Sequence, residues 1–174
     1  MRSRAFGATS TKVSEVGLGT AQFSKASRSQ NETGCMTLDR AKSIIFTAID
    51  NGITFFDTAD CYGPAEYLLG QLSSETKEEL HIATKAGLRP NLERDFSIDY
   101  LTSRVEHSRR LLQVDSLDIF QLNKPSLKDL KDERLFDFLS DLKESGRSRY
   151  CGVVVGDPAV GDICLQSESI DCVQ

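Results

Sequence analysis

Four residues with polar or ionisable side chains stand where they could carry out chemistry. Asp57 and Lys85 each follow a short apolar segment, Asn123 follows a third, and Tyr62 lies five residues beyond Asp57. A lysine directly after an apolar segment is expected to be part-buried, so it needs a counter-charge, which Asp57 could supply. An ammonium group near a phenol stabilises the phenolate and lowers the pKa of the phenol from its usual value of about 10. Lys85 beside Tyr62 would therefore make a proton donor suited to a carbonyl oxygen.

A structural interpretation of the same residues stays open at this point. Asp57 and Lys85 could form an ion pair that only stabilises the fold, with Tyr62 packed beside it. Asn123 could be a strand-end residue that bonds its own backbone. A metal site is not expected, because the two histidines have no partner at ligand spacing. Spacing alone does not decide between catalysis and structure.

Short apolar segments alternate along the chain with segments of helical periodicity. Six of the apolar segments are expected to be strands: Val16–Thr20, Ile53–Phe56, His81–Thr84, Leu117–Leu122, Tyr150–Val155 and Ile170–Val173. Because parallel neighbours need a crossover, this alternation predicts an α/β fold with a parallel sheet covered by helices. The sheet could be open and doubly wound, or it could close into a barrel. In a barrel, the carboxyl ends of the strands are where chemistry happens.

Turn and cap signals predict the remaining elements. Arg2–Phe6 and Lys12–Glu15 are expected to form an N-terminal β-hairpin, and Thr37 is expected to cap a helix. A polar stretch from Ser24 to Gly34 indicates a long surface loop. A single helix is expected over Leu127–Ser145.

Composition limits the class of protein. The 174 residues are expected to form a single domain over residues 1–174. A formal net charge of −5 argues against a nucleic-acid partner, and no apolar run is long enough to span a membrane. The first ten residues lack the apolar stretch of a secretory signal. The five cysteines, an odd number with no CxxC pair, are expected to be mostly buried thiols, which indicates a reducing, cytoplasmic setting.

Several segments resemble the aldo-keto reductase family. Phe56–Glu66, with the sequence FDTADCYGPAE, is similar to a highly specific signature of that family. Lys12–Thr20 resembles its N-terminal hairpin and first barrel strand, Ala83–Lys85 its catalytic-lysine strand, and Asp118–Leu122 its fourth strand. The resemblance implies a (β/α)8 TIM-type barrel that binds NADPH without a Rossmann domain and reduces small carbonyl substrates.

The resemblance also implies roles for individual residues. Asp57, Tyr62 and Lys85 match three of the four catalytic places of the family. Tyr62 would donate a proton, Lys85 would lower its pKa, and Asp57 would orient and neutralise Lys85. Hydride would come from the nicotinamide, since no protein side chain can supply one.

Cofactor-binding residues are implied in the same way. Gly19 and Thr20 would lie against the cofactor by backbone approach, with Asp57 beside them. Gln174 matches a glutamine of the sixth strand that holds the nicotinamide carboxamide.

Three features depart from the family pattern. Asn123 stands in the fourth catalytic place, where the family usually has a histidine. Its amide can donate a hydrogen bond but cannot titrate, and losing a general acid–base partner typically costs about 10²–10⁴ in rate. Val154 and Val155 stand where many members have polar residues that bind the carboxamide. The six expected strands are fewer than the eight of a full barrel.

We therefore expect an incomplete barrel, truncated relative to the family, and two functions stay open. The first is an NADPH-dependent carbonyl reductase with Tyr62 as proton donor. The second is a catalytically impaired homologue that acts through protein–protein contact. In the second case, self-association or a partner chain would complete the barrel.

Overall fold

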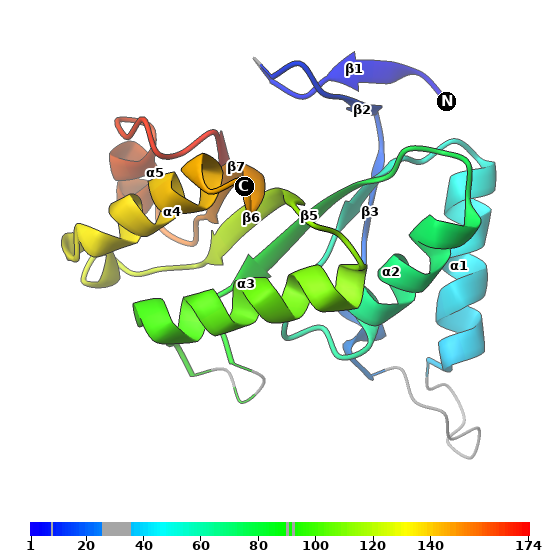
Figure 1. Ribbon diagram of the computed structural model, residues 1–174, viewed down its shortest axis with the longest axis horizontal. Helices are drawn as coiled ribbons and strands as arrows, with labels where there is room; N and C mark the ends of the chain where they lie inside the picture. The colour runs from blue at the N-terminus through cyan, green and yellow to red at the C-terminus, as the bar shows by residue number, and fades with distance from the viewer. Residues whose placement is uncertain (8, 26–35, 90, 92) are drawn as a thin grey trace. The chain divides into compact units, whose positions relative to one another are not determined.

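The computed structural model describes residues 1–7, 9–25, 36–89, 91 and 93–174 (Figure 1). Its strands are β1 (Ser3–Ala5), β2 (Lys12–Ser14), β3 (Gly17–Gly19), β4 (Phe55–Asp57), β5 (His81–Ala86), β6 (Leu117–Asn123), β7 (Ser148–Val154) and β8 (Cys172–Val173). Among the described residues, β3 to β8 form one parallel sheet whose strand order follows the chain, and β1 and β2 form a separate antiparallel pair. The expected N-terminal hairpin and parallel sheet are both confirmed.

In the part of the chain that the structure describes, one α-helix stands between each pair of consecutive strands of the parallel sheet. The helices are α1 (Leu38–Asp50), α2 (Ala65–Glu75), α3 (Ile98–Leu112), α4 (Arg134–Glu144) and α5 (Pro158–Cys164), with short 3-10 turns η1 (Ala21–Lys25) and η2 (Asp129–Lys131). A doubly wound sheet reverses its strand order at a switch point, and this sheet does not. The described residues therefore form a barrel-type α/β fold with six parallel strands, which is incomplete against the eight of a full barrel.

The chain divides into two compact units. Unit 1 comprises Met1–Ala83 together with Leu111–Gln113, and unit 2 comprises Thr84–Arg110 and Val114–Gln174. The sequence expectation of a single domain over residues 1–174 stays an expectation.

In unit 1, apolar side chains of α1, α2 and β4 form the core. Ile45, Phe56 and Leu68 are fully buried. The Thr37 hydroxyl caps α1, as its sequence predicts, by accepting a hydrogen bond from the N–H of Arg40 at 3.1 Å. Burial of these apolar side chains is the main favourable contribution to the stability of this unit.

Gly70 lets α2 approach the segment Leu111–Gln113 closely. A Cβ atom at this position would lie 2.1 Å from the carbonyl oxygen of Leu111 and 2.8 Å from the Cα of Leu112. Both are backbone atoms, which cannot move aside as a flexible side chain can. Only glycine is compatible with this packing.

In unit 2, α4 packs on β7, and both contribute to the core. The rings of Phe120 and Phe138 meet edge-on, with centroids 6.2 Å apart and an angle of 79° between their planes. Leu139 and Val153 are fully buried. Cys151 is buried as well, and its thiol contacts the carbonyl oxygen of Leu139 at 3.4 Å.

The prediction of one helix over Leu127–Ser145 is wrong. The structure has η2 and α4 there, separated by Asp132 and Glu133, and the backbone of Asp132 is extended (φ −83°, ψ 97°). The Asp132 carboxylate accepts hydrogen bonds from the N–H and the guanidinium of Arg134. A side chain that bonds the backbone two residues ahead offers the chain an alternative to a continuing helix.

Two other sequence predictions concern loops and thiols. Residues 26–34 of the expected polar loop lie outside the described residues, as does Cys35, and η1 includes the start of that loop. Cys151 and Cys164 are buried as expected, whereas Cys61 and Cys172 are partly exposed.

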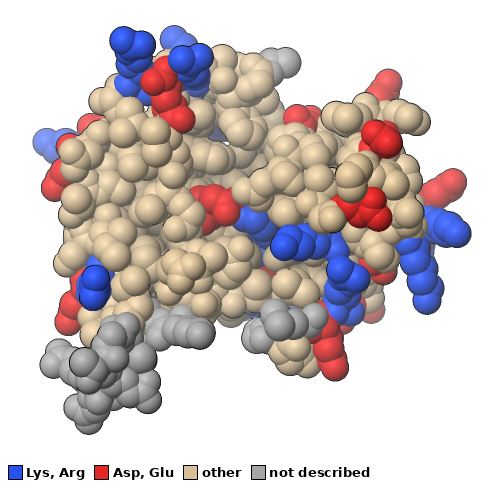
Figure 2. Space-filling view, turned by 180° about the vertical axis from the view of Figure 1, so that it is seen from behind, with Lys and Arg blue, Asp and Glu red and all other residues tan. Residues whose placement is uncertain are grey.

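Charged side chains of both signs share the surface. On the face drawn in Figure 2, Lys and Arg side chains lie beside Asp and Glu side chains in several places. None of the helices in the described ranges is long and apolar enough to cross a membrane.

Candidate active site

The ends of β3 and β4 are tied together through Asp57 and Thr20. In the register of the sheet, Asp57 lies opposite Gly19 on one side and Ala83 on the other. Its carbonyl oxygen accepts a hydrogen bond from the N–H of Thr20 at 2.9 Å and another from the Thr20 hydroxyl at 3.0 Å. Thr20 is fully buried. The hydroxyl of Thr20 therefore holds the end of β4 in place.

The loop after Asp57 fixes the backbone on both sides of Tyr62. The N–H of Tyr62 donates to the carbonyl of Ala59 at 3.0 Å, and the N–H of Ala65 donates to the carbonyl of Tyr62 at 3.2 Å. Gly63 has a φ of +57°, which glycine adopts without strain. A Cβ atom there would lie 2.8 Å from the carbonyl oxygen of Ser24, so this loop packs directly on η1.

The phenol of Tyr62 is partly exposed, and its pKa is raised above 10. Burial is the largest cause, followed by the electrostatic effects of Asp57 and then of Cys61. Both effects disfavour the phenolate. Tyr62 therefore holds its proton at neutral pH, which is the state from which a proton donor acts. The lowering of this pKa by Lys85, expected from the sequence, stays a prediction.

In unit 2, the remaining candidate residues lie near the carboxyl ends of their strands. Lys85 belongs to β5 and is 3% exposed, and Asn123 ends β6 and is 4% exposed. Asn123 lies opposite Val154 in the register of β6 and β7. The Gln174 backbone continues the pairing of β8 with β7: its N–H donates to Val153 at 3.0 Å. The side chain of Gln174 is exposed.

The two units hold different parts of the candidate site. Gly19, Thr20, Asp57 and Tyr62 belong to unit 1, whereas Lys85, Asn123 and Gln174 belong to unit 2. Within unit 1, Asp57 bonds Thr20 directly and its charge acts on Tyr62. The grouping of all seven residues into one site stays a prediction.

The motif of the Tyr62 loop and the strand order together point to a known family, and comparison with known proteins decides the matter. The sequence model of the Aldo/keto reductase family matches residues 15–173. The chain belongs to this family. The resemblance inferred from the sequence is confirmed.

Curated proteins similar to this chain include a named reductase and an uncharacterized oxidoreductase. A 6-dehydroglucose reductase from Novosphingobium aromaticivorans is 38% identical over 133 residues, a match that covers 70% of this chain and 43% of that protein. An uncharacterized oxidoreductase from Bacillus subtilis is 33% identical over 164 residues, covering 88% of this chain and 48% of that protein. The chain thus spans about half the length of the curated relatives it matches.

Solved aldo-keto reductase structures share the fold. The holo form of an aldo-keto reductase from Bacillus halodurans matches with a TM-score of 0.82 and 26% identity, covering 99% of this chain and 56% of that one. A glycerol dehydrogenase from Gluconobacter oxydans matches with a TM-score of 0.81 and 28% identity, covering 99% of this chain and 54% of that one. The chain is therefore a homologue of aldo-keto reductases in both sequence and fold.

Aldo-keto reductases use a nicotinamide cofactor, and Gly19 and Gln174, each taken within its own unit, have properties compatible with contacting such a ligand. A Cβ atom added to Gly19 would meet no atom within 4 Å, so a ligand has room to lie against the backbone there. The exposed amide of Gln174 can donate and accept hydrogen bonds. The valine side chain of Val154 offers neither, so it adds no polar contact.

Proposed function

We propose that this chain is an NADPH-dependent oxidoreductase that reduces a small carbonyl substrate. The observation that supports this most directly is the Tyr62 loop: a protonated, half-buried phenol follows Asp57 in the signature segment of the aldo-keto reductase family. The names of similar proteins, a 6-dehydroglucose reductase among them, fit carbonyl reduction.

In this proposal, Tyr62 delivers its phenolic proton to the carbonyl oxygen of the substrate. NADPH, when bound, supplies the hydride. Lys85 is buried, and as an ammonium it would stabilise the phenolate left behind, while Asp57 would balance its charge. The amide of Asn123 would donate a hydrogen bond to the same carbonyl oxygen, in the place where the family usually has a histidine.

Three residues would position the cofactor. Gly19 leaves the backbone accessible, and Gln174 would bond the nicotinamide carboxamide through its exposed amide. Thr20 acts indirectly, because its hydroxyl is bonded to Asp57 and so sets the position of the strand end. We further propose a cytoplasmic setting, because buried thiols such as those of Cys151 and Cys164 are typical of reducing compartments.

Titration of the purified 174-residue chain with NADPH, followed by nicotinamide fluorescence, tests the proposal. We expect saturable binding, and oxidation of NADPH when an aromatic aldehyde is added. Gly19→Val fills the open space beside the backbone and should weaken NADPH binding while leaving the urea unfolding curve in place, since no neighbour lies within 4 Å. Tighter binding of NADH than of NADPH would identify NADH as the preferred cofactor. If neither nucleotide bound saturably, the proposal would be contradicted.

A further inference from the structure

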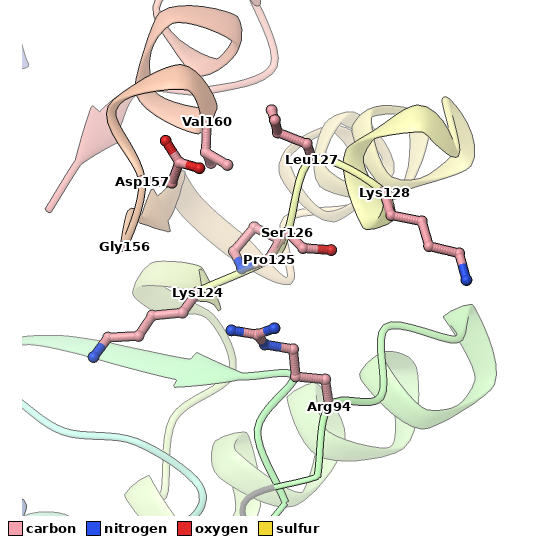
Figure 3. Close-up of a pocket in the computed structure, with 9 residues that line it drawn as sticks. All are labelled: Arg94, Lys124, Pro125, Ser126, Leu127, Lys128, Gly156, Asp157 and Val160. Atoms are coloured by element: carbon pink, nitrogen blue, oxygen red, sulfur yellow. The ribbon is translucent and has the colours of Figure 1, made fainter.

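Unit 2 contains a pocket at the carboxyl ends of β6 and β7. Its cavity of about 420 Å³ is formed by the loop that follows β6, by Arg94, and by the segment that begins α5 (Figure 3). A volume of this size lies within the range of roughly 300–1,000 Å³ that is typical of small-molecule sites. Sequence reasoning does not single out these residues as functional.

Three cationic side chains and one carboxylate line the pocket: Arg94, Lys124, Lys128 and Asp157. In Figure 3 the guanidinium of Arg94 lies near Lys124 and Pro125, and the two lysine side chains extend in opposite directions. Positive charges therefore exceed negative ones in this pocket, although the whole chain has a net charge of −5.

Nearby carboxylates are already engaged with other groups. Asp129 accepts hydrogen bonds from the N–H and the hydroxyl of Ser126, each at 2.7 Å. Asp95 pairs with Arg89. Asp157 caps α5 by accepting from the N–H of Ala159 at 3.0 Å. Among the residues that the structure describes, no salt bridge joins Arg94, Lys124 or Lys128 to a carboxylate, so a ligand can complement their charge.

The backbone of Lys124 is held in an unfavourable conformation. Its φ is +57°, in the left-handed region, which is unfavourable for a residue other than glycine. Its N–H donates to the carbonyl of Val154 at 3.0 Å, and Pro125 follows directly. Such conformations are concentrated at functional sites, where the surroundings hold them in place.

Apolar side chains supply part of the pocket wall. Leu127 is 39% exposed although it is a large hydrophobic residue, and Val160 faces the pocket from α5 (Figure 3). An exposed leucine beside cationic groups suits a ligand with an apolar body and an anionic group.

We propose that this pocket binds the anionic group, a carboxylate or a phosphate, of a small molecule with an apolar body. Lys124 directly follows Asn123, so we assign this molecule as the carbonyl substrate, an assignment that rests on the proposed function. The substrate class would then be anionic aldehydes or ketones.

Binding of 4-methylbenzoate, which cannot be reduced, tests the pocket without any need for turnover. Calorimetry should show that wild-type protein binds it, and that the neutral 4-methylbenzamide binds about tenfold more weakly, the effect expected from losing one charged hydrogen bond. Arg94→Gln and Lys124→Gln should weaken binding of the carboxylate. Arg149→Gln is the matched control, because Arg149 is exposed near the start of β7 and does not line the pocket. Equal affinity for the two probes, or equal weakening by Arg149→Gln, would overturn the proposal.

Turnover and competition distinguish the pocket from the substrate assignment. With NADPH present, 4-carboxybenzaldehyde should be reduced with a higher kcat/KM than 4-methylbenzaldehyde. Lys124→Gln should bring the kcat/KM values of the two aldehydes closer together. Carboxylate binding without turnover of either aldehyde would leave the pocket standing and contradict the proposed function. Equal kcat/KM values for both aldehydes, or displacement of 4-methylbenzoate by NADPH, would overturn the assignment of the pocket to the substrate.

Discussion

The carbonyl oxygen of Asp57 accepts two hydrogen bonds from Thr20, one from its N–H and one from its hydroxyl, at 2.9 and 3.0 Å. The pair joins the carboxyl ends of β3 and β4 at a position where Thr20 is completely shielded from solvent. The two bonds fix the backbone that carries the Asp57 carboxylate relative to Thr20, so the positions of these two candidate residues depend on each other.

Thr20→Val should reveal the contribution of this constraint. Valine keeps the shape of threonine and removes only the hydroxyl, and Asp57 keeps its bond to the N–H. We expect the free energy of unfolding to fall by about 1 kcal/mol, as for a typical hydrogen bond, in urea denaturation. Thr20→Ser restores the donor and serves as the control. A Thr20→Val protein as stable as wild type would show that the hydroxyl bond contributes nothing.

Tyr62→Phe should abolish proton donation while leaving the cofactor in place. We expect kcat for an aromatic aldehyde to fall by about 10²–10⁴, with NADPH affinity unchanged. Tyr67→Phe removes a hydroxyl from the same region at a side chain that is 43% exposed, and it should have no effect on kcat. Steady-state kinetics and a fluorescence titration measure both quantities. Unchanged turnover in Tyr62→Phe would eliminate Tyr62 as the donor.

Two helical glycines should respond to the same substitution with opposite signs. Gly70→Ala places a Cβ 2.1 Å from the carbonyl oxygen of Leu111, and overpacking of this kind costs roughly 1–3 kcal/mol. Gly161→Ala, in α5, meets no atom within 4 Å and should stabilise the protein by about 0.5–1 kcal/mol, because alanine favours the helix. Thermal or urea unfolding of both variants measures the two changes in stability. A Gly70→Ala protein as stable as wild type would show that Gly70 does not pack closely on the backbone of Leu111.

Alkaline pH should destabilise the protein in part through Cys151. Burial raises the pKa of this thiol from 9 to about 12 in the folded state. The folded state therefore holds its proton longer than the unfolded state does. The resulting stability is complete below pH 9 and is lost as the pH rises toward 12. Urea unfolding between pH 8 and 11 should show a steeper loss of stability in wild type than in Cys151→Ala. Parallel slopes would mean that other groups are responsible.

The sequence predicts the fold well where local signals and packing agree. Thr37 begins α1 because its side chain satisfies an N–H of the first turn, a signal that is visible in the sequence. The interruption at Asp132 has no glycine or proline to mark it. It depends on the bonds that the Asp132 carboxylate accepts from the N–H and the guanidinium of Arg134, which compete with a continuing helix.

The candidate site could be inferred only in part. Asp57, Tyr62 and Lys85 stand in recognisable motifs, so their positions near strand ends follow from the sequence. The role of the Thr20 hydroxyl does not, because its bond spans 37 positions of the chain. Neither does the conformation of Lys124, since lysine carries no sequence signal for a positive φ.

Unit 1 is not a continuous stretch of chain, and this has a consequence for synthesis on the ribosome. A nascent chain that has reached Ala83 contains α2 and Gly70 but lacks Leu111–Gln113, the segment against which Gly70 packs. The unit that carries Asp57 and Tyr62 can therefore be completed only after all of α3 has been made. Until then, the face of α2 that contains Gly70 stays without the segment that covers it in the folded protein.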